Sequence, residues 1–308
     1  MPLFAKKDVI GLKDLSATEI MSILDTAETM KTLLNQKNKK APHLQGKSVV
    51  LLFYNKSTRA KLSYELAAQY LSASYVDMTV ADDIDEQTNL VDTGRIIDQM
   101  GGDFIILRHP MAGSAKLLSE NVKASVINAE DGINENPSQS LLDLLTIKNH
   151  KGGFDGLKVT MMGDISYSPV SKSNIWGLLK LGAKVSVAAP PTIIPPELKS
   201  FGVDVHYDAY EAVRGADVIM VWRAKLSPRL PSLQEYKNFF KVDEEMVNLA
   251  KKDVIIMHPG PINRGIDISS KILDSGRHQC LVEDQIANGV AVRMAILYLL
   301  SLKGGVVL

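Results

Sequence analysis

The stretch SVVLLFYNKSTRAKLSYELA, residues 48–67, joins an apolar run to a helix-like pattern. The apolar run ends at Tyr54, and Ser57, Thr58 and Arg59 stand where the helical pattern begins. In open α/β sheets, ligands bind at the carboxyl ends of the strands, and the N–H groups at a helix start attract anions such as phosphate. Two hydroxyls and a guanidinium at this junction therefore predict a phosphate site. An N-cap followed by a surface arginine is the simpler alternative.

Short apolar runs alternate with helical patterns along the whole chain, and the first helical pattern begins with a capping box at Ser16 and Glu19. The runs fall into two series: 48–54, 74–78, 103–108 and 124–128, then 157–163, 183–189, 203–207, 217–222 and 253–258. Apolar runs separated by helices are typical of parallel sheets that are covered on both faces. The sequence therefore predicts an α/β fold with two doubly wound parallel-sheet domains.

The composition excludes several functional classes. The chain has 308 residues, 45% of them hydrophobic, which is enough for about two domains. The 35 basic and 35 acidic residues balance, so the charge favours neither nucleic acid nor an anionic membrane. The one cysteine, Cys280, excludes an intramolecular disulfide, and neither a signal peptide nor a membrane-length apolar run is found. We therefore expect a cytoplasmic protein.

Two segments bear on the domain organisation. In NENPSQSLLDLLTIKNHKGG, residues 134–153, Asn136 is a predicted helix N-cap and Pro137 the first helical residue. We expect the chain to divide into its two domains here. The last helical pattern, 286–302, is apolar enough to pack on either domain.

Two further strand ends carry residues that suit an anion. Arg108 and His109 follow the third apolar run, and Gln139 stands in the first turn of the helix after the fourth. Because the carboxyl ends of parallel strands meet at one edge of a sheet, we expect these side chains to converge with Arg59 on one crevice. Singly, each has a simpler explanation as a surface charge, a loop histidine or a solvent-facing amide. No glycine-rich nucleotide fingerprint is found, which disfavours a nucleotide-dependent dehydrogenase.

Four motifs follow one another in the order of a known family: Ser57-Thr58-Arg59, Arg108-His109-Pro110, NAEDGINENPSQSLLDLLTI (128–147) and MHPGPINRGIDI (257–268). Together they resemble the aspartate/ornithine carbamoyltransferase family over nearly the whole chain. HPGPINRG is similar to the aspartate branch, since the ornithine branch has a cysteine-containing motif there. The resemblance implies the carbamoyltransferase fold, with the C-terminal helix packing back on the first domain. The implied domains are a carbamoyl phosphate-binding domain, 1–135 with 292–308, and an amino-acid (aspartate)-binding domain, 136–291.

The resemblance implies transfer of the carbamoyl group of carbamoyl phosphate to the amine of L-aspartate, giving N-carbamoyl-L-aspartate and phosphate, as in pyrimidine biosynthesis. In such an acyl transfer the protein must stabilise charge on the carbonyl oxygen and on the leaving phosphate. No metal or organic cofactor is implied. The implied catalytic residues are Arg59, Thr58, Arg108 and Gln139. The implied carbamoyl phosphate ligands are Ser57, Thr58, Arg59, Arg108, Asn136, Gln139, Gly260 and Pro261.

The two carboxylates of aspartate require cations on the acceptor side. The resemblance implies Arg223, Lys225 and Lys172 as acceptor-binding residues, and Arg223 matches an arginine that holds a substrate carboxylate. Arg264 is either a further such cation or part of a structural ion pair. The resemblance also implies a homotrimer in which a loop of the neighbouring subunit, 79–90 here, lies near each site. Dihydroorotase or regulatory chains are further candidate partners.

Several positions depart from the family pattern. Asn136 replaces a histidine that polarises the carbamoyl oxygen, and an amide cannot carry a positive charge. Pro169 replaces an arginine that grips the acceptor, and Lys225 replaces a glutamine. In the loop 79–90, Glu86 stands where a phosphate-binding lysine is expected. One misplaced unit charge at ~4 Å costs on the order of 4 kcal/mol at an effective dielectric constant of about 20.

These departures leave three hypotheses open. The first is a member of the aspartate branch with reduced or altered activity. The second is a carbamoyltransferase for a different amine acceptor. The acidic residues of the loop 79–90 and Pro169 favour it. The third is a non-catalytic paralog with a binding or scaffolding role, which the joint loss of the histidine and lysine positions favours.

Overall fold

The residues that the computed structural model describes are 4–79, 89–274 and 279–302. The chain forms two compact units: unit 1 comprises residues 1–145 and 287–308, and unit 2 comprises residues 146–286. The chain passes from unit 1 to unit 2 within α5 (Pro137–Lys151) and returns within α11 (Val282–Ser301).

Unit 1 is built on a parallel sheet whose strand order, within the described residues, is β2-β1-β3-β4. Its strands are β1 (Ser48–Phe53), β2 (Ser74–Thr79), β3 (Phe104–His109) and β4 (Ser125–Asp131). β1 is buried along nearly its whole length because neighbouring strands flank it on both sides and helices cover both faces. The parallel order places the ends of β1, β3 and β4 at one edge of the sheet.

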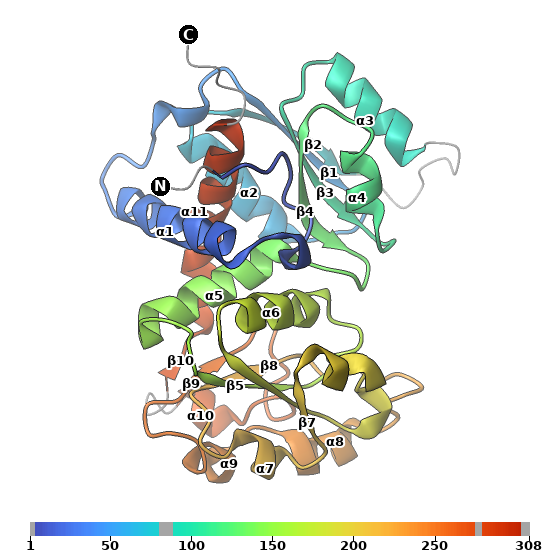
Figure 1. Ribbon diagram of the computed structural model, residues 1–308, viewed down its shortest axis with the longest axis vertical. Coiled ribbons are helices and arrows are strands. Elements are labelled where there is room, and N and C mark those ends of the chain that lie inside the picture. Colours follow the sequence, from blue (N-terminus) through green and yellow to red (C-terminus); the bar gives the residue numbers. More distant parts are fainter. Residues whose placement is uncertain (1–3, 80–88, 275–278, 303–308) are drawn as a thin grey trace. The chain divides into compact units, whose positions relative to one another are not determined.

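Helices cover both faces of this sheet (Figure 1). The helices of unit 1, besides α5 and α11, are α1 (Ala17–Leu34), α2 (Thr58–Tyr70), α3 (Leu90–Gln99) and α4 (Ser114–Ser119). α3 and α4 pack on one face, around the core of Val50, Leu52, Ile97, Ile105, Leu107, Ala115, Leu118 and Val126. α1, α2 and α11 lie on the other face, so unit 1 is doubly wound.

Unit 2 repeats this architecture with a larger parallel sheet, ordered β10-β9-β8-β5-β6-β7 in the part of the chain that the structure describes. The strands are β5 (Lys158–Met162), β6 (Lys184–Ala188), β7 (Asp204–His206), β8 (Val218–Val221), β9 (Ile255–Met257) and β10 (Gln279–Cys280). Its helices are α6 (Pro169–Lys180), α7 (Ala209–Val213), α8 (Leu233–Phe240), α9 (Glu244–Asn248) and α10 (Ser270–Asp274). Figure 1 shows α6 over one face of the sheet and α7 and α9 over the other. Short 3-10 helices occupy Leu12–Asp14 and Pro42–Leu44 in unit 1, and Pro191–Ile193 and Pro196–Phe201 in unit 2.

The fold predicted from the sequence is confirmed. Each of the nine predicted strands is found, and the sequence missed β10, which has only two residues. The capping box at Ser16 is present, with the Glu19 N–H donating to its hydroxyl. The C-terminal helix packs back on unit 1: the Arg293 guanidinium lies 4.7 Å from the centre of the Tyr64 ring. None of the described helices has both the length and the apolar character that crossing a membrane requires.

Candidate active site

The junction between β1 and α2 leaves the start of the helix without a side-chain cap. Ser57 is the N-cap residue, with φ −152° and ψ 84°, and its side chain makes no capping hydrogen bond. Its carbonyl oxygen accepts from the Lys61 N–H at 3.0 Å, which begins the helical ladder. The first N–H groups of a helix have no partner within it. A serine that does not cap them leaves both its hydroxyl and the helix start suited to an anionic ligand.

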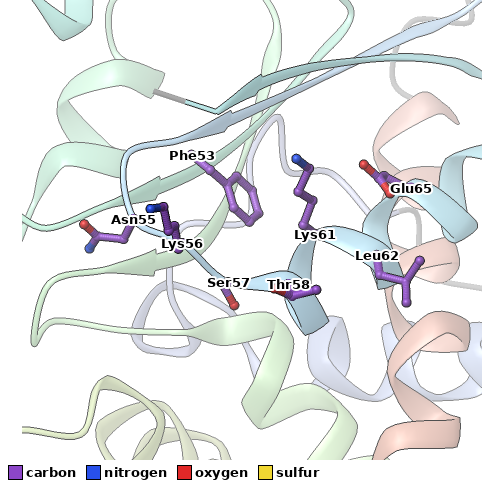
Figure 2. A pocket seen from close by; sticks show the side chains of 8 residues that line it. All are labelled: Phe53, Asn55, Lys56, Ser57, Thr58, Lys61, Leu62 and Glu65. Carbon is purple, nitrogen blue, oxygen red and sulfur yellow. The ribbon is translucent and has the colours of Figure 1, made fainter. Parts of the chain in front are cut away.

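A pocket of about 390 Å³ opens at this junction. It is lined by Phe53, Asn55, Lys56, Ser57, Thr58, Lys61, Leu62 and Glu65. Figure 2 shows Ser57 and Thr58 at the start of α2 and Lys61 on the next turn of the helix. The Lys61 ammonium forms an ion pair with Asp77 of β2, and this hydrogen bond raises the pKa of Lys61. Arg59, the second residue of α2, is exposed and is not among the residues that line the pocket.

Arg108, at the end of β3, is held by an acidic partner. Its Nη2 donates to Glu130 Oε1 at 2.6 Å, and its Nη1 donates to the Ala129 carbonyl oxygen at 3.3 Å. The two charged side chains are 15% and 25% exposed. Arg108 Nε is buried and has no hydrogen-bond partner among the residues that the structure describes. The guanidinium thus lies at the expected strand end, but a carboxylate of the same chain occupies it.

Glu130 lies in a β-bulge of β4. Leu107 pairs with Asn128 and His109 pairs with Asp131, so β4 has one more residue than β3 in this interval. Glu130 takes φ 124°, which L residues other than glycine rarely adopt. The buried Asn128 side chain fixes the bulge, because its Oδ1 accepts from the Glu130 N–H at 2.9 Å. Bulges of this kind re-aim a side chain, and here the re-aimed group is the Glu130 carboxylate.

Asn136 joins the same cluster. Its Nδ2 donates to Glu130 Oε2 at 3.2 Å, so one carboxylate contacts both Arg108 and Asn136. Its Oδ1 accepts from the Gln139 N–H at 3.2 Å, which is the N-cap hydrogen bond predicted for α5. The Gln139 side chain turns to Asp143, with Nε2 and Oδ1 3.2 Å apart. The structure therefore brings Arg108 and Asn136 together around Glu130, and the Gln139 N–H contacts Asn136.

Hydrogen bonds hold the HPGPINRG segment of unit 2, residues 258–265. His258 Nδ1 accepts from the Gly260 N–H at 2.7 Å, and His258 Nε2 lies 3.3 Å from Asp267 Oδ2, both side chains being fully buried. Asp267 Oδ1 accepts from the Ala224 N–H at 3.1 Å, and Asn263 Nδ2 donates to the Ala224 carbonyl oxygen at 3.2 Å. Asn263 of this segment and Asp267 just after it thus hold both backbone polar groups of Ala224, between Arg223 and Lys225.

Cations gather after β8. Arg223 and Lys225 are both exposed, on either side of the fixed Ala224. Burial raises the pKa of Asp164, which follows β5, and the charges of Lys225 and Arg229 act to lower it. The Arg229 guanidinium lies 5.4 Å from the centre of the Tyr167 ring. Cations in this segment suit a carboxylate ligand, because hydrogen bonds between two charged groups are among the strong ones.

The remaining predicted site residues are at the start of α6, in the HPGPINRG segment and in the loop 79–90. Pro169 is the buried first residue of α6, after the N-cap Ser168, and Lys172 lies in the first turn of that helix. Arg264 Nη1 pairs with the two carboxylate oxygens of Asp274 at 2.9 and 3.0 Å, which agrees with the structural ion pair of the two alternatives. Glu86 lies outside the described residues, as does most of the loop 79–90. The roles of the predicted site residues remain predictions.

Sequence reasoning missed Lys61, Glu130, Asp164 and Arg229. Lys61 and Arg229 carry a signal in the sequence, since each is a cation shortly after a strand end. Gly260, which takes φ 69°, and Pro261 follow His258 in unit 2.

Among the described residues, no group of three or more His, Cys, Asp or Glu side chains is arranged to hold a metal ion.

Family models match the two halves of the chain separately. Residues 7–149 match the carbamoyl-phosphate-binding domain of aspartate/ornithine carbamoyltransferase. Residues 155–300 match the aspartate/ornithine-binding domain of the same family.

Curated relatives and solved structures match over nearly the full length. An aspartate carbamoyltransferase catalytic subunit from Acetivibrio thermocellus is 53% identical over 304 residues, covering 97% of each chain. One from Ruminiclostridium cellulolyticum is 50% identical over 303 residues, covering 97% of this chain and 96% of the relative. The catalytic subunit of M. jannaschii aspartate transcarbamoylase has a TM-score of 0.84 at 34% identity, covering 97% of this chain and 100% of the other. Ornithine carbamoyltransferase from Pyrococcus furiosus has a TM-score of 0.87 at 28% identity, covering 97% and 98%.

Proposed function

The chain belongs to the aspartate/ornithine carbamoyltransferase family, and from this membership we propose that it is a transferase that moves the carbamoyl group of carbamoyl phosphate to the amine of L-aspartate. The products are N-carbamoyl-L-aspartate and phosphate. This transfer is a reaction of pyrimidine biosynthesis. The observation that carries the proposal is the identity of about half of all residues with relatives named aspartate carbamoyltransferase catalytic subunit. The cytoplasm is the proposed location, in keeping with a single, free cysteine.

On the donor side, the uncapped start of α2 supports a phosphate site. Ser57 and Thr58 offer hydroxyl donors in the pocket, and Arg59, exposed on the same turn but outside the pocket lining, offers a charged fork. Arg108 supplies the cation at the end of β3 that stabilises the oxyanion and the leaving phosphate. Asn136 and Gln139 hold the carbamoyl group through their amides. The departing phosphate accepts the amine proton, so the chemistry needs no separate protein base.

On the acceptor side, unit 2 offers cations for the two carboxylates of aspartate. Arg223 and Lys225 stand on the fixed segment after β8, and Lys172 lies on α6. Gly260 and Pro261 shape the neighbouring turn, which His258 holds through the Gly260 N–H. Orienting the amine against the carbamoyl carbon supplies a large part of the rate enhancement in such a reaction.

A second candidate function is a binding role with little or no catalysis. The pairing of Glu130 with Arg108 and Asn136 favours it, because an internal carboxylate competes with an anionic substrate for the same donors. A transferase for another amine acceptor is the third candidate, favoured by the acidic residues of the loop 79–90 and by the absence of an arginine at Pro169.

A product assay with a panel of amines tests the proposed function. We expect N-carbamoyl-L-aspartate to form from carbamoyl phosphate and L-aspartate, slowly, because Asn136 lacks a charge. L-ornithine should give no citrulline, since the acceptor side carries cations and an ornithine side chain is itself cationic. Transfer to a different amine would establish the third candidate. Binding of phosphate without transfer to any amine would establish the second.

The proposed assembly is a homotrimer in which a neighbour contributes to each site. Its support is β2, an edge strand of the unit 1 sheet, on which Val76 is 55% and Met78 37% exposed. Exposed apolar side chains on an edge strand mark an interaction surface. Dihydroorotase or regulatory chains are the further proposed partners.

Sedimentation at micromolar concentration should give a species of three times the 33.7 kDa chain mass. A Val76→Glu variant should shift it towards monomer, because a buried unpaired carboxylate destabilises an interface. The matched control is Phe239→Glu on α8 of unit 2, where the phenylalanine is 61% exposed. A wild-type monomer, or equal dissociation of both variants, would contradict this assembly.

A further inference from the structure

One carboxylate of unit 1 occupies the groups that the proposed function assigns to the anionic substrate. Glu130 Oε1 accepts from Arg108 Nη2 at 2.6 Å, and Glu130 Oε2 accepts from Asn136 Nδ2 at 3.2 Å. Each oxygen of the carboxylate thus takes one of the donors. A carboxylate and a phosphate present the same kind of charged acceptor to a guanidinium, so only one of them can take this donor geometry at a time.

The backbone of Glu130 indicates that this placement opposes the local preference of the chain. At φ 124° a side chain meets steric resistance that glycine does not. The surroundings enforce the conformation: Asn128 Oδ1 binds the Glu130 N–H, and the next residue, Asp131, accepts from the Gly113 and Glu135 N–H groups at 2.8 and 3.1 Å. An observed outlier that its neighbours over-determine is a reasonable starting point for a functional hypothesis.

We propose that Glu130 is an internal anionic ligand of the carbamoyl phosphate site, which an incoming phosphate group must displace from Arg108 and Asn136. This inference rests on the proposed function for the assignment of those two residues to the donor substrate. Glu130 then acts as a specificity-determining residue. It lowers the affinity for phosphate-bearing ligands, because binding breaks a charge-assisted hydrogen bond and brings two negative groups together.

A purely structural ion pair is the competing explanation. The two explanations differ in what happens when the charge is removed but the shape is kept. Glu130→Gln retains a hydrogen-bonding side chain at the bulge and removes the competing charge. A structural pair predicts a lower melting temperature and unchanged phosphate affinity. An internal ligand predicts a gain in phosphate affinity.

Titration calorimetry with inorganic phosphate on the full chain tests the proposal. Glu130→Gln should bind phosphate about ten- to a hundredfold more tightly than the wild type, the range for one hydrogen bond to a charged group. The matched control is Glu120→Gln, which also removes one carboxylate from an ion pair of unit 1, with Lys116, but on an exposed helix end. It should leave phosphate affinity unchanged, which separates a local effect from one of net charge.

Two further variants keep the test decisive if Glu130→Gln folds poorly. Glu130→Gly and Glu130→Ala both lack the carboxylate, and both should gain phosphate affinity. Only glycine suits φ 124°, so Glu130→Gly should have the higher melting temperature of the two. In an Arg108→Ala background, Glu130→Gln should give a clearly smaller gain, because the donor released from the charged hydrogen bond is missing and only Asn136 and the relief of charge repulsion remain.

The results separate this proposal from the proposed function. Unchanged phosphate affinity in the Glu130 variants would overturn the proposal, whatever reaction the chain catalyses. So would a gain of the same size without Arg108. A gain that Arg108→Ala reduces would support the proposal, even if the wild type formed no carbamoyl product and the proposed function failed.

Discussion

An Arg108→Ala variant is expected to lose carbamoyl transfer by about a hundred- to a thousandfold in kcat/KM, the usual effect of removing one pre-organised donor. The side chain is only 15% exposed, and it is oriented by the Ala129 carbonyl oxygen and by Glu130. Once an incoming phosphate has displaced Glu130, the guanidinium requires little further reorganisation when charge develops on the carbonyl oxygen and on the phosphate. Steady-state kinetics with varied carbamoyl phosphate measures the loss.

Two controls separate this catalytic effect from a loss of stability. Arg95→Ala removes an arginine of the same unit that is 59% exposed and paired with Asp92, and it should leave kcat/KM unchanged. Arg108→Ala alone leaves the Glu130 carboxylate with one fewer partner, which should cost about 1–3 kcal/mol of stability. The double variant with Glu130→Gln should recover stability but remain inactive. Recovery of full activity in that variant would mean that Arg108 serves only to neutralise Glu130.

The sequence predicted the sheets well because their strands are buried on both faces. β1, β3 and β8 each contain an unbroken run of buried apolar residues, and such runs are recognisable without any partner. β10 has two residues, Gln279 and Cys280, and no periodicity can be read from so short a segment. Its place in the sheet comes from pairing with Ile255 and Ile256 of β9, which is tertiary information.

The junction sites were predictable for a related reason. Ser57 and Asn136 each stand between a strand and a helix, where the chain pattern changes period, and both occupy helix starts in the structure. The sequence did not predict which of the two side chains caps its helix. Asn136 Oδ1 caps α5 in the ordinary way, whereas the Ser57 hydroxyl does not cap α2, and both residue types are common N-caps.

Glu130 shows why the chemistry of the site required the structure. In the sequence it is one of two acidic residues after an apolar run, and its simplest interpretation is a solvated loop end. Its position depends on a bulge set by the register of β3 against β4 and by the buried Asn128. No single-sequence pattern encodes that register. Nor does the sequence alone show that Arg108 and Asn136 share one carboxylate.

The second large expected effect is a change in kcat/KM when the hydrogen bond between Glu130 and Asn136 is altered. A histidine in place of Asn136 offers a charged donor to the carbamoyl oxygen only if no carboxylate takes it first. With Glu130 present, its Oε2 lies 3.2 Å from the Asn136 amide nitrogen and would pair with an imidazolium at that position. Asn136→His alone should therefore give little gain in kcat/KM, and it should lose about 1 kcal/mol of stability with the α5 cap.

Glu130→Gly combined with Asn136→His should behave differently. If the released Arg108 and the charged histidine each supply ~1.4 kcal/mol at the transition state, kcat/KM for aspartate carbamoylation rises about a hundredfold. The two single variants and the double variant form a cycle, and the gain of the double should exceed the sum of the single gains, because the two residues are in contact. Rates of N-carbamoyl-L-aspartate formation, with melting temperatures for each variant, measure this coupling. A full gain from Asn136→His alone would show that Glu130 does not reach position 136 during turnover. No gain in a folded double variant would show that the histidine cannot reach the carbamoyl oxygen from the start of α5.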